Sequence, residues 1–411
     1  MNIKIVNKGF EDSVIVNKNH FDVTTNKFWD SEISKMSYDA ISWLFDNNSE
    51  NIEYTFHTLE DVKLQPNEKF YFIYNSSRLN FSLLDGGNLP YEFIDLFKQK
   101  NLKIIFLDPH ESVLYYKLQN LSNFISSNKI DKERFLYINN DYSIEKKSND
   151  LNFIGKKWNH LFINTSRGYI NDSKNIIFKK DREFVFLSKN KMIKPHRLIF
   201  LSFLQKNNLL NITNYSCLHQ MDYDNKTIRD EIKEIFGNTI LNYFLKNIHS
   251  IRDWDFIQTK YEKGKYTIKE EEHINYAGVH DFRDYDSSYI NLTTESGFKE
   301  DFLHISEKSL KPFAMYQLPI IVSCPFHVKA MKELYDLDMF DDFIDHSYDK
   351  ETNNVKRMNM IFNEILRLTE LQNTLPKFFE DNKQRFIDNR NKIEKIGRWR
   401  EKKLFNYILN Y

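Results

Sequence analysis

The stretch that decides the fold is residues 103–111, with the sequence KIIFLDPHE. Its first five residues form a short, mostly apolar run that stops at a polar group, and residues 135–139, FLYIN, form a second such run. Runs of this length are typical of parallel strands that are buried on both faces. Residues 112–126 between them have the length of a helix, so the stretch predicts a βαβ unit with ordinary loops.

The same alternation extends in both directions along the chain. A polar stretch at 165–180 separates two series, and from 354 onward the chain is predicted to be almost entirely helical, with interruptions at Pro376 and Gly397. Strands that alternate with helices twice predict an α/β protein with two Rossmann-like, doubly wound domains facing a cleft. The predicted domains are 1–175, 176–350 and a helical extension at 351–411. The further strands are predicted at 70–74, 160–163, 183–187, 212–217, 289–292 and 319–323, and the further helices at 195–205 and 227–248, the latter broken at Gly237.

Composition and charge limit the function classes. The 411 residues contain 58 Lys plus Arg and 58 Asp plus Glu, so the basic excess of a dedicated nucleic-acid binder is absent. The two cysteines, Cys217 and Cys324, suit neither a disulfide framework nor a zinc site. The N-terminal residues lack a signal-peptide core, and no apolar run approaches the ~18 residues of a membrane span. These features predict a cytoplasmic protein without a transmembrane segment.

One segment, residues 289–323, combines a strand, a polar loop, a helix start and a second strand. Ser306 is a favourable N-cap residue and Glu307 suits the first turn of a helix. Lys308 and Lys311 are three residues apart and would share one face. Two cations beside a helix start suit a diphosphate, and the carboxylates of Glu295 and Glu307 would accept hydrogen bonds from ribose or sugar hydroxyls.

Two alternatives remain for this segment. Pro312 lacks an N–H group, so the helix either kinks there or begins later than Ser306. The segment could also be a solvated helix start, with an ordinary serine cap and two surface lysines.

Further short motifs accompany this segment in a fixed order. They are NLTTES (291–296), FLHISEKSLKPF (302–313), LPII (318–321), DMFDDF (338–343), Ser347-Tyr348-Asp349, Arg357, and upstream FLSKN (186–190) with Pro195-His196-Arg197. In this order, over about residues 183–360, they resemble the α-1,3-fucosyltransferase family and its phage and bacterial relatives. The departures are Ser306, where the family usually has Thr, and residues 310–312, which differ from its aromatic continuation, so the donor sugar stays open.

This resemblance implies a GT-B type glycosyltransferase with a GDP- or UDP-sugar donor and neither a required metal nor a further cofactor. It implies that Arg197 and Lys308 neutralise the donor pyrophosphate, which agrees with the charge that develops on a diphosphate leaving group. It also implies that Glu307 holds ribose or sugar hydroxyls. The alternative for Arg197 is an exposed helix residue. The remaining donor-binding candidates are Glu295, Ser296, Ser306, Lys311, Lys189 and Asn190.

An inverting transfer also needs a general base for the acceptor hydroxyl. Glu111, His110 and Asp108 follow the strand 103–107, where doubly wound sheets place their ligands. The alternative is a polar loop in which Asp108 caps the next helix. Four Asp-X-Asp pairs, at 222/224, 253/255, 284/286 and 336/338, could in principle hold a divalent metal, but such pairs are frequent in a chain this rich in Asp.

The C-terminal residues 390–403 are basic, and apolar residues between 399 and 408 add an apolar side. They are interpreted as a helix that packs back across the domains; the alternative is a patch for an anionic membrane or DNA. Three functions follow from the whole sequence. They are transfer of a sugar to a glycan or glycolipid, phage-type transfer to a hydroxylated base in DNA, and non-catalytic binding of a sugar nucleotide.

Overall fold

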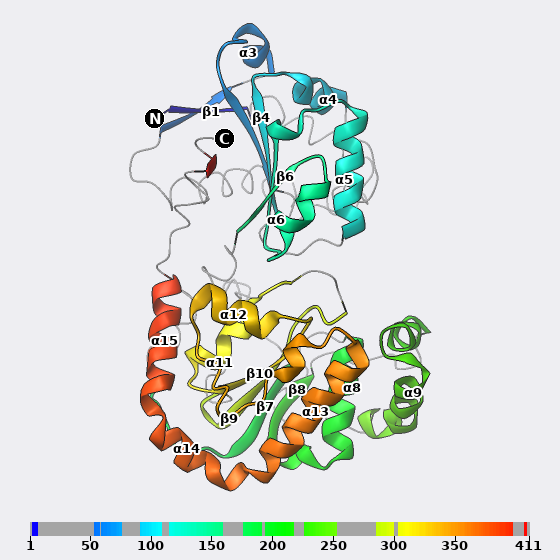
Figure 1. The fold of residues 1–411 in the computed structure, drawn as a ribbon, viewed down its shortest axis with the longest axis vertical. Helices are drawn as coiled ribbons and strands as arrows, with labels where there is room; N and C mark the ends of the chain where they lie inside the picture. The colour runs from blue at the N-terminus through cyan, green and yellow to red at the C-terminus, as the bar shows by residue number, and fades with distance from the viewer. Residues whose placement is uncertain are drawn as a thin grey trace, which may run out of the picture. The chain divides into compact units, whose positions relative to one another are not determined.

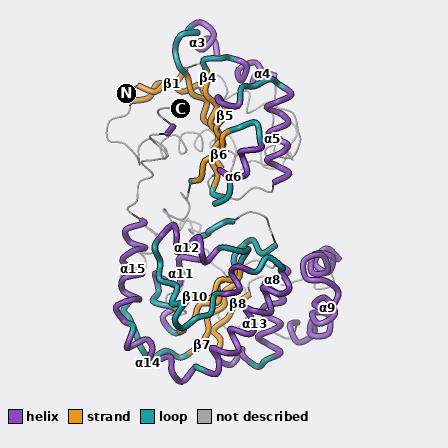
Figure 2. Tube along the Cα trace, viewed as in Figure 1, coloured by secondary structure: helices purple, strands orange, loops and turns teal. Residues whose placement is uncertain are grey.

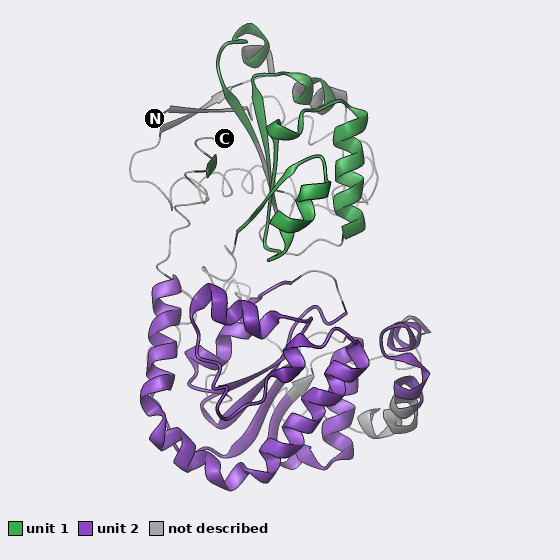
Figure 3. Ribbon diagram, in the orientation of Figure 1, with its two compact units in different colours: residues 1–160, 399–411 green, residues 161–398 purple. Residues whose placement is uncertain are grey.

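The computed structural model divides the chain into two compact units, residues 1–160 with 399–411, and residues 161–398 (Figure 3). The boundary was predicted after residue 175 and is observed after residue 160. Residues 161–175, between the two, lie outside the described residues. The predicted extension, 351–411, is not a unit of its own, because residues 351–398 group with the second unit and the last thirteen with the first. The described residues are 2–6, 53–57, 59–75, 91–108, 115–158, 176–190, 194–217, 226–252, 285–299, 303–397 and 407–408.

The described part of the first unit contains a six-stranded parallel sheet with the order β2-β1-β3-β4-β5-β6 (Figure 2). The three strands predicted at 70–74, 103–107 and 135–139 are confirmed, and the strand predicted at 160–163 lies outside the described residues. The strands are β1 (Asn2–Val6), β2 (Glu53–His57), β3 (Phe70–Asn75), β4 (Leu102–Asp108), β5 (Phe135–Asn139) and β6 (Ile154–Lys157).

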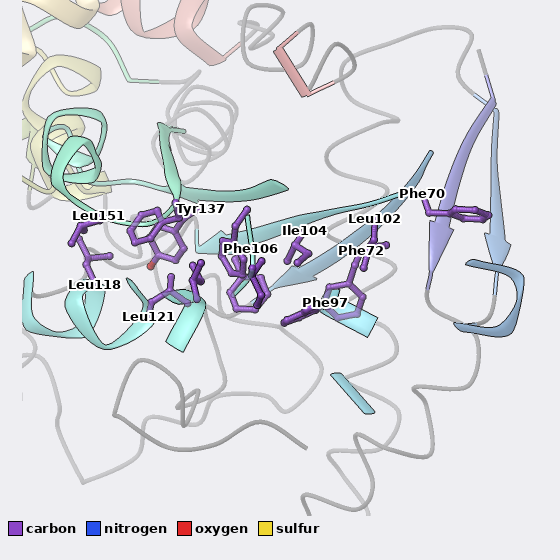
Figure 4. Close-up of a cluster of buried hydrophobic side chains, with 14 of the residues drawn as sticks. Phe70, Phe72, Phe97, Leu102, Ile104, Phe106, Leu118, Leu121, Tyr137 and Leu151 are labelled. Atoms are coloured by element: carbon purple, nitrogen blue, oxygen red, sulfur yellow. The ribbon is translucent and has the colours of Figure 1, made fainter. Parts of the chain in front are cut away.

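Helices α4 and α5 cover the apolar core of this sheet (Figure 4). Phe106 on β4 and Phe135 on β5 have ring centroids 4.8 Å apart, and Phe97 on α4 packs edge-on against both rings. The predicted helix at 112–126 is observed as α5. The helices are α3 (Leu59–Leu64), α4 (Tyr91–Lys98), α5 (Tyr115–Ser127) and α6 (Ile144–Lys147), with 3-10 turns at Lys132–Arg134 and Ser148–Asp150.

The described part of the second unit contains a four-stranded parallel sheet with the order β10-β9-β7-β8. All four strands were predicted, because each is a short run of mainly apolar or β-branched residues. Two parallel sheets with intervening helices, one in each unit, are compatible with a two-domain Rossmann-like α/β fold. The strands are β7 (Phe184–Asn190), β8 (Thr213–Cys217), β9 (Ser288–Thr294) and β10 (Leu318–Val322).

Helices flank this second sheet, with α8 and α13 to its right in Figure 1 and α15 to its left. Phe203 of α8 stacks on Phe362 of α13. Gly237, with φ 76°, breaks α9 at the predicted position. No helix in the described ranges is both long and apolar enough to cross a membrane. The helices are α8 (Pro195–Lys206), α9 (Lys226–Arg252), α11 (Lys311–Ala314), α12 (His327–Tyr335), α13 (Asn354–Glu370), α14 (Leu375–Asp381) and α15 (Lys383–Gly397).

The basic residues of α15 contact its own unit. Arg390 donates to the carbonyl of Ala314, and the Nζ of Lys392 lies 3.0 Å from a carboxylate oxygen of Asp336. Two of the three described basic residues of the C-terminal segment, Arg390 and Lys392, therefore contact protein, whereas Lys395 is exposed. Residues 398–406 lie outside the described residues.

We expect Phe106→Ala to lower the free energy of unfolding by about 3–5 kcal/mol, because it removes a ring that is 1% exposed and leaves a cavity between β4, β5 and α4. The control is Leu64→Ala, since Leu64 is 77% exposed and its loss should change stability by less than about 0.5 kcal/mol. Urea denaturation followed by circular dichroism measures both variants. Equal effects of the two substitutions would contradict the assigned core.

Candidate functional site

Polar residues gather at the carboxyl end of the second sheet. Strands β7, β9 and β10 end at Asn190, Thr294 and Val322, and the chain continues from β9 into Glu295, whose N–H donates to the carbonyl of Val322 (3.0 Å). In open α/β sheets this end is where ligands bind. The polar loop of segment 289–323, which was predicted to bind a diphosphate, therefore begins at the expected edge.

The carboxylate of Glu295 lies at the centre of this cluster and is fully buried. Its two oxygens accept hydrogen bonds from the hydroxyls of Ser306 (2.6 Å) and Ser309 (2.5 Å), and longer ones from the main-chain N–H groups of Ser306 and Ser296 (both 3.3 Å). A buried carboxylate is tolerated only with such donors. The prediction that Glu295 binds sugar hydroxyls does not fit this geometry, because a ligand would have to displace one of them.

The ionised carboxylate of Glu295 determines where the protons lie in a hydrogen-bonded chain of Ser309, His327 and Ser323. Burial by itself raises the pKa of Glu295, but the charge of Lys308 and the hydrogen bond from Ser306 help to hold it well below its ordinary value. Ser309 gives its only hydroxyl proton to this carboxylate, so its oxygen accepts from Nε2–H of His327 (2.9 Å). The Nδ1 atom of His327 then accepts from the hydroxyl of Ser323 (2.9 Å). Burial lowers the pKa of His327, in keeping with this neutral form.

Arg197 and His196, near the start of α8, bind the main chain after β9. Arg197 is 4% exposed, and its Nη2 donates to the carbonyls of Thr294 (3.1 Å) and Glu295 (3.2 Å). It is therefore not an exposed helix residue, and its Nη2 is already engaged by these main-chain carbonyls. The Nε2 of His196 donates to the carbonyl of Glu295 (2.9 Å), and burial and the charge of Arg197 lower the pKa of His196 to about 3.

Ser306 is confirmed as an N-cap residue, since its hydroxyl accepts from the N–H of Lys308 (3.2 Å). The element it caps is a 3-10 turn of four residues, Glu307–Leu310, and α11 begins only at Lys311 with Pro312 as its second residue. The later helix start is thus the correct alternative for Pro312. Such a short turn carries little macrodipole, so the predicted helix-dipole contribution to diphosphate binding is not supported.

Two ammonium groups lie beside Ser296. The Nζ of Lys308 is 3.3 Å from the Ser296 hydroxyl and 3.5 Å from the carboxylate of Glu307, and its side chain is 28% exposed. The Nζ of Lys194 donates to the Ser296 carbonyl (2.5 Å). Lys194 was not predicted, although it directly precedes Pro195 at the start of α8. Three predicted donor-binding residues meet here and are partly exposed: Lys308, Ser296 and Glu307, whose side chain is 16% exposed.

The other predicted donor-binding residues point elsewhere. Lys311 does not share a face with Lys308, because its Nζ lies 6.0 Å from the ring centre of Tyr285, before the start of β9, whereas Lys308 contacts residues after the end of β9. Lys189 donates to the side chain of Asn214 on β8 (2.7 Å). Asn190 is 2% exposed and accepts from the hydroxyl of Thr294 (2.5 Å).

The downstream residues of the resemblance are structural in this fold. The carboxylate of Asp349 accepts from the N–H groups of Val328 (2.8 Å) and Lys329 (3.0 Å) and so caps α12. The hydroxyl of Tyr348 accepts from the N–H of Ile321 (3.2 Å). Arg357 is 1% exposed and donates to the carbonyl of Ser323 (3.1 Å).

The predicted general bases belong to the first unit. Asp108 ends β4 and pairs in register with Asn139 at the end of β5. Only the main chain of Asp108 belongs to the described part of the structure. His110 and Glu111 lie outside the described residues. At the same end of the sheet Asp141 is 1% exposed, accepts from Ser143 and forms an ion pair with Lys147 (2.9 Å).

No group of three His, Cys, Asp or Glu side chains in the described ranges is placed to hold a metal ion. Asp338 forms an ion pair with Arg385 (2.7 Å) and Asp336 one with Lys392, so the pair 336/338 is committed to α15. Asp286 forms an ion pair with Lys179. The remaining members of the four Asp-X-Asp pairs lie outside the described residues.

Comparisons with protein-family models, with curated proteins and with solved structures find no match to this chain. Function is therefore inferred from the residues and their geometry.

We expect Glu295→Gln to lower the free energy of unfolding at pH 7 by about 3 kcal/mol. The hydroxyls of Ser306 and Ser309 donate to the negative charge of the buried carboxylate, and the neutral amide removes that charge. The folded-state pKa of Glu295 is depressed, so its stabilising contribution is present above the ordinary pKa of 4.5 and is lost as the pH falls below it. The gap between wild type and variant should therefore narrow below pH 4.5. Denaturant unfolding at several pH values measures this gap.

The matched control is Glu307→Gln, because Glu307 is the neighbouring accessible carboxylate and pairs with the same lysine. Its substitution should cost less than about 1 kcal/mol. A gap for Glu295→Gln that stays constant from pH 7 to pH 3 would contradict the assigned charge.

Proposed function

We propose that this chain is a glycosyltransferase of GT-B type that moves a sugar from a nucleotide-diphosphate sugar to a hydroxyl acceptor. The observation that carries the proposal is the pair of ammonium groups, from Lys194 and Lys308, beside Ser296 at the carboxyl end of the second sheet. The resemblance of residues 183–360 to the α-1,3-fucosyltransferase family supports the same reading.

The chemistry of the transfer gives these cations a role. As the glycosidic bond breaks, negative charge grows on the nucleoside diphosphate that leaves. Fixed cations at the position of that charge lower the barrier because they need no reorganisation during the reaction. Lys308 is held in place by Ser296, Ser306 and the carboxylate of Glu307. Arg197 is assigned to positioning, since it fixes the carbonyls just before Ser296.

The accessible carboxylate of Glu307 is proposed to accept hydrogen bonds from ribose or sugar hydroxyls. The acceptor is proposed to be a glycan or a glycolipid. The general base that takes the proton of its hydroxyl is proposed to be Glu111, His110 or Asp108 of the first unit. Transfer is proposed to proceed without a metal ion, because protein cations take the place of a divalent ion at the diphosphate.

We expect Lys308→Ala to reduce kcat/KM by at least about tenfold, equal to ~1.4 kcal/mol of transition-state stabilisation, because the leaving diphosphate loses a cation. The control is Lys311→Ala, since this lysine lies three residues away but points to the other end of β9. A thermal-shift panel of UDP-, GDP-, CMP- and dTDP-sugars identifies the donor first, because binding raises the apparent stability of the folded chain.

Release of the nucleoside diphosphate then measures the reaction. Equal kinetics for wild type and Lys308→Ala would refute the phosphate role. A chain that binds a sugar nucleotide but never releases a diphosphate is a binding module. Transfer to hydroxymethylated DNA, with none to glycans or glycolipids, would replace the proposed acceptor.

The charge argument also predicts the response to a chelator. We expect transfer to keep its full rate in excess EDTA, because the diphosphate is neutralised by side chains. The rate is measured with and without EDTA on protein first dialysed against it. Loss of activity that returns on addition of Mg²⁺ or Mn²⁺ would show that a metal is required.

A further inference from the structure

An aromatic side chain stands exposed at the same end of the sheet as Lys308. Phe326 lies in the turn between β10 and α12, and it is 45% exposed. The next residue, His327, is fully buried. The turn thus directs one ring into the protein and leaves the other in contact with solvent.

The backbone of Phe326 adopts the left-handed conformation, with φ 67° and ψ 14°. A bulky residue rarely adopts this region, where Gly, Asn or Asp is favoured. The residue before a helix normally has an extended backbone and a side chain that caps the first turn, and Phe can do neither. Asp349 supplies what Phe326 lacks: its carbonyl accepts from the N–H of Phe326 (2.7 Å), and its carboxylate caps α12.

Neither the fold nor the cap therefore explains a phenylalanine at this position. A ring that is nearly half exposed contributes less to the core than a fully buried one, and the backbone conformation opposes it. Of the other described aromatic residues with positive φ, Phe340 is fully buried and Tyr316 packs on Phe178. Phe326 differs because its ring is available to a ligand.

The position of Phe326 relative to Lys308 follows from one shared carboxylate. Lys308 Nζ lies 3.9 Å from one oxygen of Glu295, and the Nε2 of His327, the residue after Phe326, lies 4.0 Å from the other. The strained turn and the ammonium group thus flank the same buried group at the carboxyl end of adjacent strands.

We propose that Phe326 is the stacking platform for the nucleobase of the nucleoside diphosphate. The inference rests on the proposed function, since it assigns the base of the same donor. A phenyl ring offers an apolar face to any base and no hydrogen bond, so it contributes affinity without selecting purine or pyrimidine. The proposal places the diphosphate at Lys308 and the base at Phe326, on the two sides of the buried carboxylate of Glu295.

The test is isothermal titration of the full chain with GDP, UDP and inorganic pyrophosphate. Phe326→Asn removes the ring but keeps a residue that tolerates the left-handed backbone, so the variant should fold and melt no lower than wild type. We expect it to weaken the better-bound nucleotide about tenfold and to leave pyrophosphate binding unchanged. Phe326→Trp should retain nucleotide affinity within about threefold.

The control variant is Tyr116→Asn, which removes a comparably exposed ring from α5 of the first unit and should leave all three affinities unchanged. A folded Phe326→Asn variant that binds the nucleotide as wild type does would overturn the stacking role. Wild type that binds pyrophosphate as tightly as either nucleotide would also overturn it while leaving the diphosphate site intact. Wild type that binds none of the three overturns the proposed function itself.

Discussion

The buried carboxylate of Glu295 is the group on which the carboxyl end of the second sheet depends. Three segments that are separate in the sequence converge on it: the end of β9, the 3-10 turn Glu307–Leu310, and the first residue of α12. An ionised group without solvent needs a donor for each lone pair that faces the protein, and serine hydroxyls supply the shortest contacts. The position of Lys308 is a consequence, because its main chain and its side chain both contact Ser306.

Much of the fold could be predicted because its strands are short apolar runs. The strands that were missed show the limits of that signal. β6, with the sequence IGKK, and β2, with EYTFH, are the two edges of the first sheet, where polar residues are tolerated because the strand has one neighbour. β1, with NIKIV, is short and includes a lysine, and it was not distinguished from an irregular N-terminus.

The site was predicted less completely, for a different physical reason. The spacing of residues along the chain predicted that Ser306 is a cap and that Lys308 lies near the ligand-binding end of the sheet. Both predictions depend only on local backbone geometry. Spacing could not show that Glu295 turns into the protein and that Arg197 binds carbonyls, since burial depends on residues about 100 positions away. Lys194 was missed because its contact with Ser296 is of this long-range kind.

The serine and histidine network around Glu295 also limits how the sequence can change over time. Ser309 has one proton and gives it to Glu295, so His327 must present Nε2–H, and Ser323 must donate to the opposite nitrogen. Replacing any one member leaves a buried polar atom without its partner, whereas replacing all of them with apolar residues removes the demand. Intermediate sequences are therefore disfavoured, and descendants of this chain should inherit the four residues as a block or lose them as a block.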